Sequence, residues 1–296
     1  MAEPRETHRS RLQQRLAEPA VLKAPGVYDA LTALLVEQAG FDCGFVSGAG
    51  ISFARYGRPD MGLVTASEVA ATVAAMRERT DIPLIVDMDT GFGNALNAQR
   101  TLCEFERAGA SAVQMEDQTF PKRCGHMAGK SVIPSSEMVG KLHAVVDARE
   151  HEHTLVIART DALGVNGFDD AMERGERYLE AGADALFIEA PGDIAQIERI
   201  GEHFGQRTPL VYNLLEGGNS PLSTAAEVET AGFRIALFPV ALLHRAIPAM
   251  QGLLQTIASD GSTVAQHSDM LDISGINQLL GAPDLLAVSE RYRGDG

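Results

Sequence analysis

The sequence of 296 residues predicts an α/β fold, a (β/α)8 barrel of the TIM type with a C-terminal helical extension. Three observations predict it. A pattern recurs in which a helical segment ends in Ala-Gly, an apolar strand follows, and the strand stops at a polar residue. Eight apolar runs have the length of strands and alternate with helical patterns. The runs are apolar throughout, as in parallel strands covered on both faces, and no G-x-G-x-x-G motif favours an open dinucleotide-binding sheet.

The elements follow in order along the chain. The expected strands are residues 21–26, 44–48, 83–89, 112–117, 155–161, 185–190, 209–213 and 235–239. The expected helices between and after them are residues 30–38, 67–79, 97–108, 135–150, 168–181 and 240–257. Ala-Gly pairs precede four of the strands, and glycine in that place is the usual helix C-cap. No linker divides the chain, so we expect residues 1–258 to form the barrel with an N-terminal helix. Residues 259–296 would form the helical extension, which packs on the barrel or on a neighbouring subunit.

Composition narrows the possible partners and the compartment. The 25 Lys and Arg against 40 Asp and Glu give a net charge of −15, and no basic block interrupts this balance. Nucleic acid and anionic membranes are therefore poor partners. No apolar signal-peptide core or membrane-length run occurs, so we expect a soluble, cytoplasmic protein. Three scattered cysteines exclude a disulfide framework. We expect Cys43 and Cys103 to pack in the interior, which leaves Cys124 as a candidate reactive thiol.

Polar residues stand where the expected strands end, which is where barrel enzymes place their chemistry. These residues are Ser47, Asp87, Asp89, Glu116, Arg159, Asp161, Glu189 and Asn213. Asp87 and Asp89 lie two apart on one strand, so both would face the same way and Met88 the other. With Glu116 on the next strand they would form an oxygen-rich site for Mg²⁺. A single aspartate would more often cap the following loop or helix, and the trio favours the metal.

The cations near these strand ends have two interpretations each. Arg159 follows a buried strand and could clamp a carboxylate, or it could form a structural ion pair with Glu189 or Asp161. Lys122 and Arg123 lie in a loop, where single cations are more often solvated than bound to a ligand.

The loop from Gln118 to Ser131 places Cys124 between two cations and His126, an environment that favours a reactive, accessible thiol. The loop is long for a βα connection and contains two glycines, which suits a lid over a substrate. A lone cysteine is otherwise inert packing, and His126 could equally be a surface residue.

Nine motifs in register carry a family resemblance. They are PGVYDA, SGAG, GRPD, DMDTGFGN, MEDQ, PKRCGH, ARTDA, FIEAP and NLLEGGNSP. With them the chain resembles the isocitrate lyase and phosphoenolpyruvate mutase superfamily over essentially the whole barrel. PKRCGH is the most specific motif, because it is typical of the carbon–carbon lyase branch with its 2-methylisocitrate lyase, 2,3-dimethylmalate lyase and petal death protein-like members. The resemblance implies a homotetramer in which neighbouring subunits exchange a C-terminal helix.

The resemblance also implies roles for individual residues. Asp87 would bind Mg²⁺, or Mn²⁺, directly, and the metal's water ligands would be held by Asp60, Asp89 and Glu116. Substrate carboxylates would be gripped by Ser47, the Gly48 and Ala49 amides and Arg159. The gating loop would consist of Lys122, Arg123, Cys124, Gly125 and His126, with Cys124 as the proton donor. Glu189 and Asn213 would contact the distal part of the substrate, and Tyr28 would line the mouth.

The implied activity is a Mg²⁺-dependent carbon–carbon lyase. It would cleave a 2-hydroxy di- or tricarboxylate, of the 2-alkylmalate or 2-methylisocitrate type, by retro-Claisen-type chemistry to a 2-oxo acid and a carboxylic acid. Glu216-Gly217-Gly218 looks more like the 2-alkylmalate-cleaving members. Oxaloacetate decarboxylase or hydrolase activity stays open, as does phosphonate chemistry, although phosphonate relatives resemble Lys-x-Asn where this chain has Lys122-Arg123-Cys124. A non-catalytic barrel that only binds a metal or a dicarboxylate is the remaining alternative.

Overall fold

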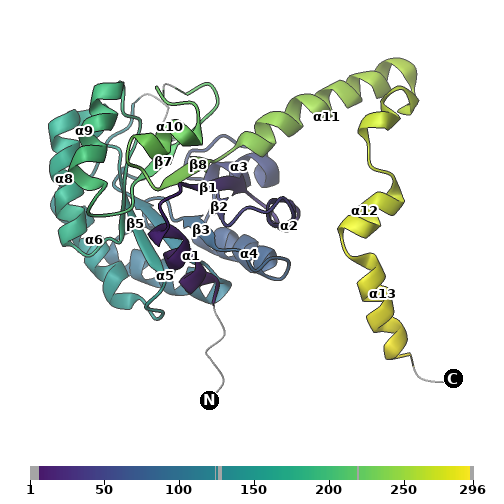
Figure 1. The fold of residues 1–296 in the computed structure, drawn as a ribbon, viewed down its shortest axis with the longest axis horizontal. Coiled ribbons are helices and arrows are strands. Elements are labelled where there is room, and N and C mark those ends of the chain that lie inside the picture. The colour runs from purple at the N-terminus through teal and green to yellow at the C-terminus, as the bar shows by residue number, and fades with distance from the viewer. Residues whose placement is uncertain (1–6, 124, 126–128, 219, 294–296) are drawn as a thin grey trace. The chain divides into compact units, whose positions relative to one another are not determined.

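The barrel is the central feature of the computed structural model, which describes residues 7–123, 125, 129–218 and 220–293. Eight parallel strands are hydrogen-bonded in the order β6-β5-β4-β3-β2-β1-β8-β7 (Figure 1). An isolated bridge between Leu186 and Leu210 brings β6 beside β7, so the sheet nearly closes on itself. The predicted fold class is confirmed.

All eight strands coincide with the expected runs. They are β1 (Leu22–Val27), β2 (Gly44–Val46), β3 (Leu84–Asp87), β4 (Ala112–Glu116), β5 (Leu155–Thr160), β6 (Ala185–Ile188), β7 (Val211–Asn213) and β8 (Ile235–Phe238). The expected helices are found as α2 (Ala30–Gln38), α4 (Ala66–Arg77), α5 (Ala95–Ala108), α6 (Ser135–Ala148), α8 (Phe168–Glu180) and α11 (Ala241–Asp260).

Several helices were not expected individually. They are α3 (Gly48–Tyr56), α7 (Leu163–Asn166), α9 (Ile194–Phe204) and α10 (Ala225–Thr230). Helix α3 could not be predicted from the sequence because its first turn contains Gly48 and Gly50, which are poor helix formers. A cap compensates: Ser47 Oγ accepts a hydrogen bond from the Gly50 amide at 3.0 Å, and Gly57 ends the helix in the left-handed conformation.

Two apolar layers hold the barrel together. One cluster fills the interior with side chains from all eight strands, including Phe45, Ile157, Phe187 and Leu237. Leu12 of the N-terminal helix α1 (His8–Ala17) belongs to this inner cluster, so α1 packs across the end of the barrel where the strands begin. A second cluster lies between the strands and their surrounding helices. Because the end with the strand N-termini is covered, the open end is the one where the strands terminate.

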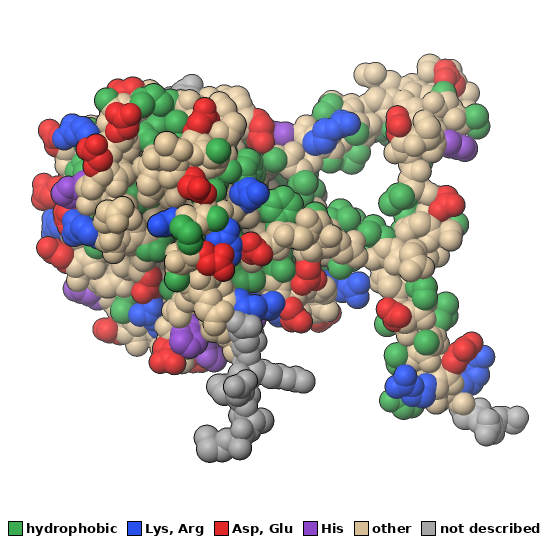
Figure 2. All heavy atoms as spheres, viewed as in Figure 1, with side chains coloured by type: hydrophobic (Ala, Val, Ile, Leu, Met, Phe, Trp, Pro, Cys, Tyr) green, Lys and Arg blue, Asp and Glu red, His purple; other side chains and the backbone are tan. Residues whose placement is uncertain are grey.

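The chain separates into two compact units, Met1–His244 and Arg245–Gly296. The second unit contains the rest of α11 followed by η1 (Val264–Asp269), α12 (Ile273–Leu279) and α13 (Ala282–Arg291). Neither α12 nor α13 has a buried residue, and Figure 2 shows apolar side chains on their surface. Within the described part of the chain, no helix combines the length and apolarity needed to cross a membrane. The cytoplasmic location stays a prediction.

Candidate active site

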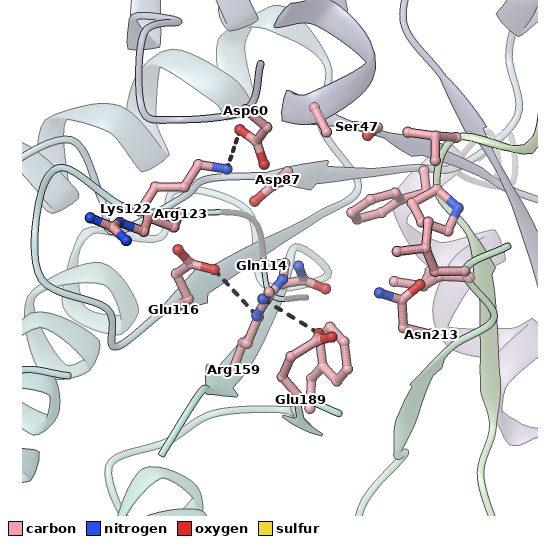
Figure 3. A pocket seen from close by; sticks show the side chains of 18 of the residues that line it. Ser47, Asp60, Asp87, Gln114, Glu116, Lys122, Arg123, Arg159, Glu189 and Asn213 are labelled. Carbon is pink, nitrogen blue, oxygen red and sulfur yellow. Dashed lines mark ion pairs between the residues drawn. The ribbon is translucent and has the colours of Figure 1, made fainter. Parts of the chain in front are cut away.

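A pocket of about 190 Å³ lies at the ends of the strands and gathers most of the predicted site residues (Figure 3). Those that line it are Ser47, Ala49, Asp60, Asp87, Glu116, Lys122, Arg123, Gly125, Arg159, Glu189 and Asn213. They come from separate parts of the chain, and the parallel strands bring them to one end of the barrel.

The other predicted residues lie elsewhere. Asp89 and Gly48 are behind Asp87, and a Cβ atom built on Gly48 would be 3.2 Å from Asp87 Oδ2, so a side chain there would press on that carboxylate. Tyr28 lines a different surface cavity, beside Asp29 and Arg55. Cys124 and His126 lie outside the described residues.

Lys122 lies among the carboxylates rather than in solvent. Its Nζ is 2.6 Å from Asp60 Oδ1 and 2.7 Å from Asp89 Oδ1, and only 4% of the side chain is exposed. The interpretation as a solvated loop cation is therefore wrong for Lys122. Burial would lower the pKa of the ammonium, but the neighbouring aspartates hold it well above its usual range. Burial raises the pKa of Asp89 to about 7, and the negative charges of Asp87 and Asp60 act in the same direction. The Lys122 ammonium opposes this increase only in part.

Asp87 and Asp89 of the Asp-x-Asp motif lie close together because of a turn, and not because they face the same way on one strand as expected. Strand β3 ends at Asp87, and Asp89 has φ +45°, so strand alternation does not place their side chains on one face. Instead the chain turns, the Asp89 amide donates to Asp87 Oδ1 at 3.1 Å, and Met88 packs in the outer core. An aspartate tolerates this left-handed conformation better than most residues do.

Arg159 is the centre of an ion-pair network on the other side of the pocket. Its Nε is 2.8 Å from Asp161 Oδ2 and 3.2 Å from Glu116 Oε2, and its Nη2 is 3.4 Å from Glu189 Oε2. The structural ion pair considered from sequence is present, and Arg159 still lines the pocket. Burial alone would raise the pKa of Asp161, but the Arg159 guanidinium and the Lys130 ammonium hold it below its usual range.

Glu116 has a free ligand position. Its Oε2 faces Arg159, whereas Oε1 is buried and has no hydrogen-bond partner among the residues that the structure describes. Burial, together with Asp161 and Asp89, raises its pKa well above the usual range although Arg159 opposes this. A buried carboxylate in this state is stabilised by an additional cation or donor.

The donor set fits Mg²⁺ held largely through water. Asp60, Asp87, Asp89 and Glu116 offer only hard oxygen atoms, and Mg²⁺ prefers such ligands while keeping several waters. No three Asp, Glu, His or Cys side chains in the described ranges lie close enough to hold a metal by themselves. The arrangement therefore suits one or two direct carboxylate ligands and not a closed protein cage.

The beginning of α3 supplies a second kind of site. Ser47 caps this helix, and Ala49 in its first turn lines the pocket. The first amides of a helix point outward and carry partial positive charge. They can therefore receive a carboxylate beside the acidic cluster.

The loop after β4 is fixed at several points. The Gln118 side chain donates to the Arg123 carbonyl at 2.9 Å and accepts from the Arg123 amide at 3.0 Å. Lys130 Nζ is 2.5 Å from the Gly125 carbonyl and 2.7 Å from Asp161 Oδ1. A Cβ atom on Gly125 would be 2.4 Å from Arg159 Nη2, so only glycine allows this close approach.

The pocket also has residues that the sequence analysis assigned no role. Gln114 is 1% exposed, and its Oε1 has no hydrogen-bond partner in the described part of the chain. The rest of the wall is largely apolar, with Phe45, Phe53, Phe187, Leu215, Leu237, Pro239 and Val240. The period of two along a strand could have found Gln114, Phe45 and Phe187, because each stands two residues before a predicted site residue. Nothing in the sequence pattern points to His244 of α11, which also lines the pocket.

Comparisons with known proteins agree with this architecture. Residues 12–258 match the family model described as phosphoenolpyruvate phosphomutase. The chain is 40% identical over 283 residues to 2,3-dimethylmalate lyase of Eubacterium barkeri, covering 96% of this chain and 97% of the relative. It is 40% identical over 262 residues to 2-methylisocitrate lyase of Bacillus subtilis (strain 168), covering 88% and 85%. It is 39% identical over 288 residues to the chloroplastic carboxyvinyl-carboxyphosphonate phosphorylmutase of Arabidopsis thaliana, covering 96% and 84%.

Solved structures with the same fold span several activities. A crystal structure of 2,3-dimethylmalate lyase has a TM-score of 0.92 at 32% identity and covers 98% of this chain and 97% of that one. Oxaloacetate acetylhydrolase with the inhibitor 3,3-difluorooxalacetate has a TM-score of 0.91 at 29% identity, covering 98% of each chain. Phosphonopyruvate hydrolase with oxalate and Mg²⁺ has a TM-score of 0.88 at 31% identity, covering 98% and 100%.

Proposed function

Because the chain belongs to the phosphoenolpyruvate mutase and isocitrate lyase superfamily, we propose that it is a Mg²⁺-dependent carbon–carbon lyase. Its substrate would be a 2-hydroxy dicarboxylate or tricarboxylate of the 2-alkylmalate or 2-methylisocitrate type. The observation that carries the proposal is the division of one pocket into an acidic cluster around Lys122 and the Arg159 network, with the loop that bears Cys124 between them in sequence.

The metal site would consist of Asp87 as the direct ligand, with Asp60, Asp89 and Glu116 holding water ligands. Glu116 Oε1, which has no hydrogen-bond partner among the described residues, and the raised pKa of Asp89 support a cation here. Bound Mg²⁺, or Mn²⁺ with the same oxygen preference, supplies Lewis-acid stabilisation of negative charge on substrate oxygens.

The protein's own groups would orient the substrate. The 2-hydroxy-carboxylate end fits between Ser47 with the first amides of α3 and the Arg159 guanidinium. Glu189 and Asn213 line the same pocket, and Asn213 Oδ1 has no hydrogen-bond partner in the described ranges. These two residues would contact the distal part of the substrate.

The reaction needs a proton removed at one end of a bond and a proton added at the other. A base takes the proton of the 2-hydroxyl, the C2–C3 bond breaks, and the electron pair moves into an enediolate form of the departing carboxylic acid. Lys122 and Arg123 would stabilise that charge, and the Cys124 thiol would give its proton to C3. The two sequence neighbours of Cys124, Arg123 and Gly125, both line the pocket, which supports this role.

The apolar wall favours a substrate with an alkyl substituent. Phe53, Leu215 and Val240 lie on the lining of the pocket together with other apolar side chains. A methyl or other alkyl group beside such a wall would gain from burial. Within the proposed class, this supports the 2-alkylmalate type.

We also propose a homotetramer in which the C-terminal unit packs on another copy. The helices α12 and α13 bury none of their residues, although Ile273, Leu285 and Leu286 are apolar and strongly exposed. Short helices without a packed face are marginal in water. An apolar cavity lined by Leu35, Phe41 and Leu242 in the first unit offers a complementary surface for a second copy.

Product analysis tests the proposed activity. The protein with Mg²⁺ is incubated separately with a 2-alkylmalate, 2-methylisocitrate, oxaloacetate and phosphonopyruvate, and products are identified by mass spectrometry. Several of these reactions release pyruvate, so the second product decides. A carboxylic acid such as propionate or succinate supports the lyase. Oxalate with acetate, or inorganic phosphate, would assign the chain to one of the alternative activities.

A further inference from the structure

Asp117 follows the metal-site residue Glu116 at the end of β4 but does not line the pocket. Its side chain is completely buried behind the pocket wall. Four donors converge on its carboxylate: the Asp161 amide on Oδ1 at 2.9 Å, and on Oδ2 Thr160 Oγ1 at 2.7 Å, Tyr178 OH at 2.7 Å and Arg174 Nη1 at 3.0 Å.

The contact with Asp161 leads directly to the active site. The register between β4 and β5 ends with Glu116 beside Arg159. Beyond this pair, the next hydrogen bond between the two segments runs from the Asp161 amide to the Asp117 carboxylate. Asp161 in turn holds Arg159 with both carboxylate oxygens, at 2.8 Å to Nε and 3.2 Å to Nη2. A bidentate contact fixes both the position and the plane of a guanidinium.

We propose that Asp117 is a positioning residue that sets the orientation of Arg159 through Asp161, and thereby the affinity for the substrate carboxylate. This inference rests on the proposed function, in which Arg159 grips that carboxylate. Asp117 itself touches no substrate.

The chemistry of the carboxylate explains why this position needs an aspartate. Four hydrogens point at its two oxygens, and only a group that accepts at both ends satisfies all of them. An asparagine has only one acceptor oxygen, so its NH₂ group would face hydrogen-bond donors on one side. The Arg174 guanidinium cannot accept a hydrogen bond from it, because it contains donors only. The fourth donor, Arg174, also balances the buried charge.

The same cluster fixes the end of the loop that follows β4. The Ile133 amide donates to the Asp117 carbonyl at 2.9 Å, and Arg174 Nη1 donates to the Ile133 carbonyl at 2.9 Å. Asp117 thus joins the end of β5, helix α8 and Ile133, which lies two residues before α6. The position of Arg159 therefore does not depend on contacts inside the pocket alone.

The test measures two affinities in Asp117→Asn by calorimetry: that of Mg²⁺ alone, and that of oxalate at saturating Mg²⁺. Oxalate is a suitable probe because it is the carboxylate in a related Mg²⁺ complex. We expect an oxalate Kd about tenfold or more above that of the parent protein. A misoriented Arg159 guanidinium would no longer hold oxalate through a charge-assisted bidentate contact. The Mg²⁺ Kd should stay within about twofold, because none of the four donors to Asp117 belongs to the proposed metal site.

A matched control and a double variant separate positioning from general damage. Asp170→Asn removes the charge of the second carboxylate that pairs with Arg174, 2.7 Å from its Nε, without touching β5, and should leave both affinities unchanged. Asp117→Asn should add little to the effect of Arg159→Lys, because both act through the same guanidinium. If Asp117→Asn does not fold, Thr160→Val and Tyr178→Phe, which each remove one donor, should each raise the oxalate Kd.

Two outcomes would overturn the positioning role. One is an unchanged oxalate Kd in folded Asp117→Asn, or in both single-donor variants. The other is a double variant whose oxalate Kd is raised by the product of the factors measured for Asp117→Asn and Arg159→Lys alone. Failure of the proposed function is recognised separately, by the product analysis described above. Loss of the carboxylate site itself would appear as a parent protein that does not bind oxalate with Mg²⁺, or as Arg159→Lys binding it as tightly as the parent.

Discussion

Lys122 Nζ lies 2.6 Å from Asp60 Oδ1, inside the carboxylate cluster that we assign to the metal. A lysine ammonium and a divalent cation would compete for the negative charge of these side chains. Loop residue Lys122 and the metal site are therefore linked, and any change in one affects the other.

Replacing this ammonium should tighten metal binding. Lys122→Met is expected to lower the Kd for Mg²⁺ by about tenfold in calorimetry at pH 8 without substrate, equivalent to about 1.4 kcal/mol. Turnover should fall at the same time, because the cation that stabilises the enediolate is lost. Arg100→Met, which removes an exposed cation on α5, is the matched control and should change neither quantity. Unchanged or weaker Mg²⁺ binding in Lys122→Met would contradict the shared-charge account.

Cys124→Ser tests the proton donor. We expect turnover to fall by about a hundredfold or more, since a positioned general acid contributes about 10²–10⁴ and serine is a far weaker acid than cysteine. The Kd for Mg²⁺ should stay within about twofold, because the thiol is not a metal ligand in this account. Cys103→Ser is the matched control, as its half-buried thiol lies near the Ala148 carbonyl and does not line the pocket. Full turnover in Cys124→Ser would remove the cysteine from the mechanism.

Gln114→Met should change stability and activity in opposite directions. Its buried Oε1 has no partner in the described residues, so an apolar side chain of similar length should raise the free energy of unfolding by about 1 kcal/mol. Because Gln114 lines the pocket, we expect its amide to contact the substrate, so kcat/KM should fall by about tenfold or more. Gln118→Met provides the contrast. It loses two hydrogen bonds to Arg123 and should lower the free energy of unfolding, by about 1–2 kcal/mol. Gln114→Met with normal activity would exclude a substrate contact.

His8 should make the protein less stable in mild acid. Burial, aided by Arg77, Arg9 and Arg11, lowers the pKa of His8 to about 3, and its Nδ1 lies 2.7 Å from Ser111 Oγ. The unfolded chain therefore takes up a proton near pH 6.5 that the folded chain takes up only near pH 3. The stabilisation is complete above pH 6.5 and is lost as the pH falls toward 3.

Urea unfolding at pH 7.5 and pH 5 measures this linkage. The parent protein should lose on the order of 1 kcal/mol more free energy of unfolding across that interval than His8→Gln, after allowance for solvent screening. An equal loss in both proteins would show that His8 does not titrate differently in the folded and unfolded chains.

The C-terminal helices should control assembly. Leu285→Glu with Leu286→Glu places two charges on the exposed apolar face of α13 and should reduce the tetramer to smaller species in light scattering after gel filtration. Ser289→Glu on the same helix adds a charge at an exposed polar position and should leave the mass unchanged. A monomeric parent protein, or a double variant that remains tetrameric, would contradict the exchange of this segment.

Much of the fold could be predicted because its signals are local. Apolar runs of strand length identified all eight strands, and α2 was predicted with the bounds that the structure has. The beginning of α3 could not be predicted in the same way. Gly48 and Gly50 oppose helix formation, and the Ser47 cap and the strand before it overcome that preference.

The site could be predicted only in part because its contacts are not local. Strand ends identified the residues around the pocket, but not their partners. Lys122 lies 62 residues from Asp60 along the chain, and loop composition alone favours a solvated lysine there. The turn at Asp89 depends on a left-handed φ value that the motif does not reveal. Asp117 has its partners on β5 and α8, so only the fold shows why an acidic residue follows Glu116.

The most direct test of the central claim is the cleavage of 2,3-dimethylmalate by the purified protein, followed by mass spectrometry with Mg²⁺ and with excess chelator. The account predicts equal amounts of pyruvate and propionate with Mg²⁺, no products with chelator, and no activity in Asp87→Ala. Full activity in chelator would contradict the metal site. Intact 2,3-dimethylmalate and 2-methylisocitrate, beside rapid conversion of oxaloacetate to oxalate and acetate, would contradict the lyase assignment.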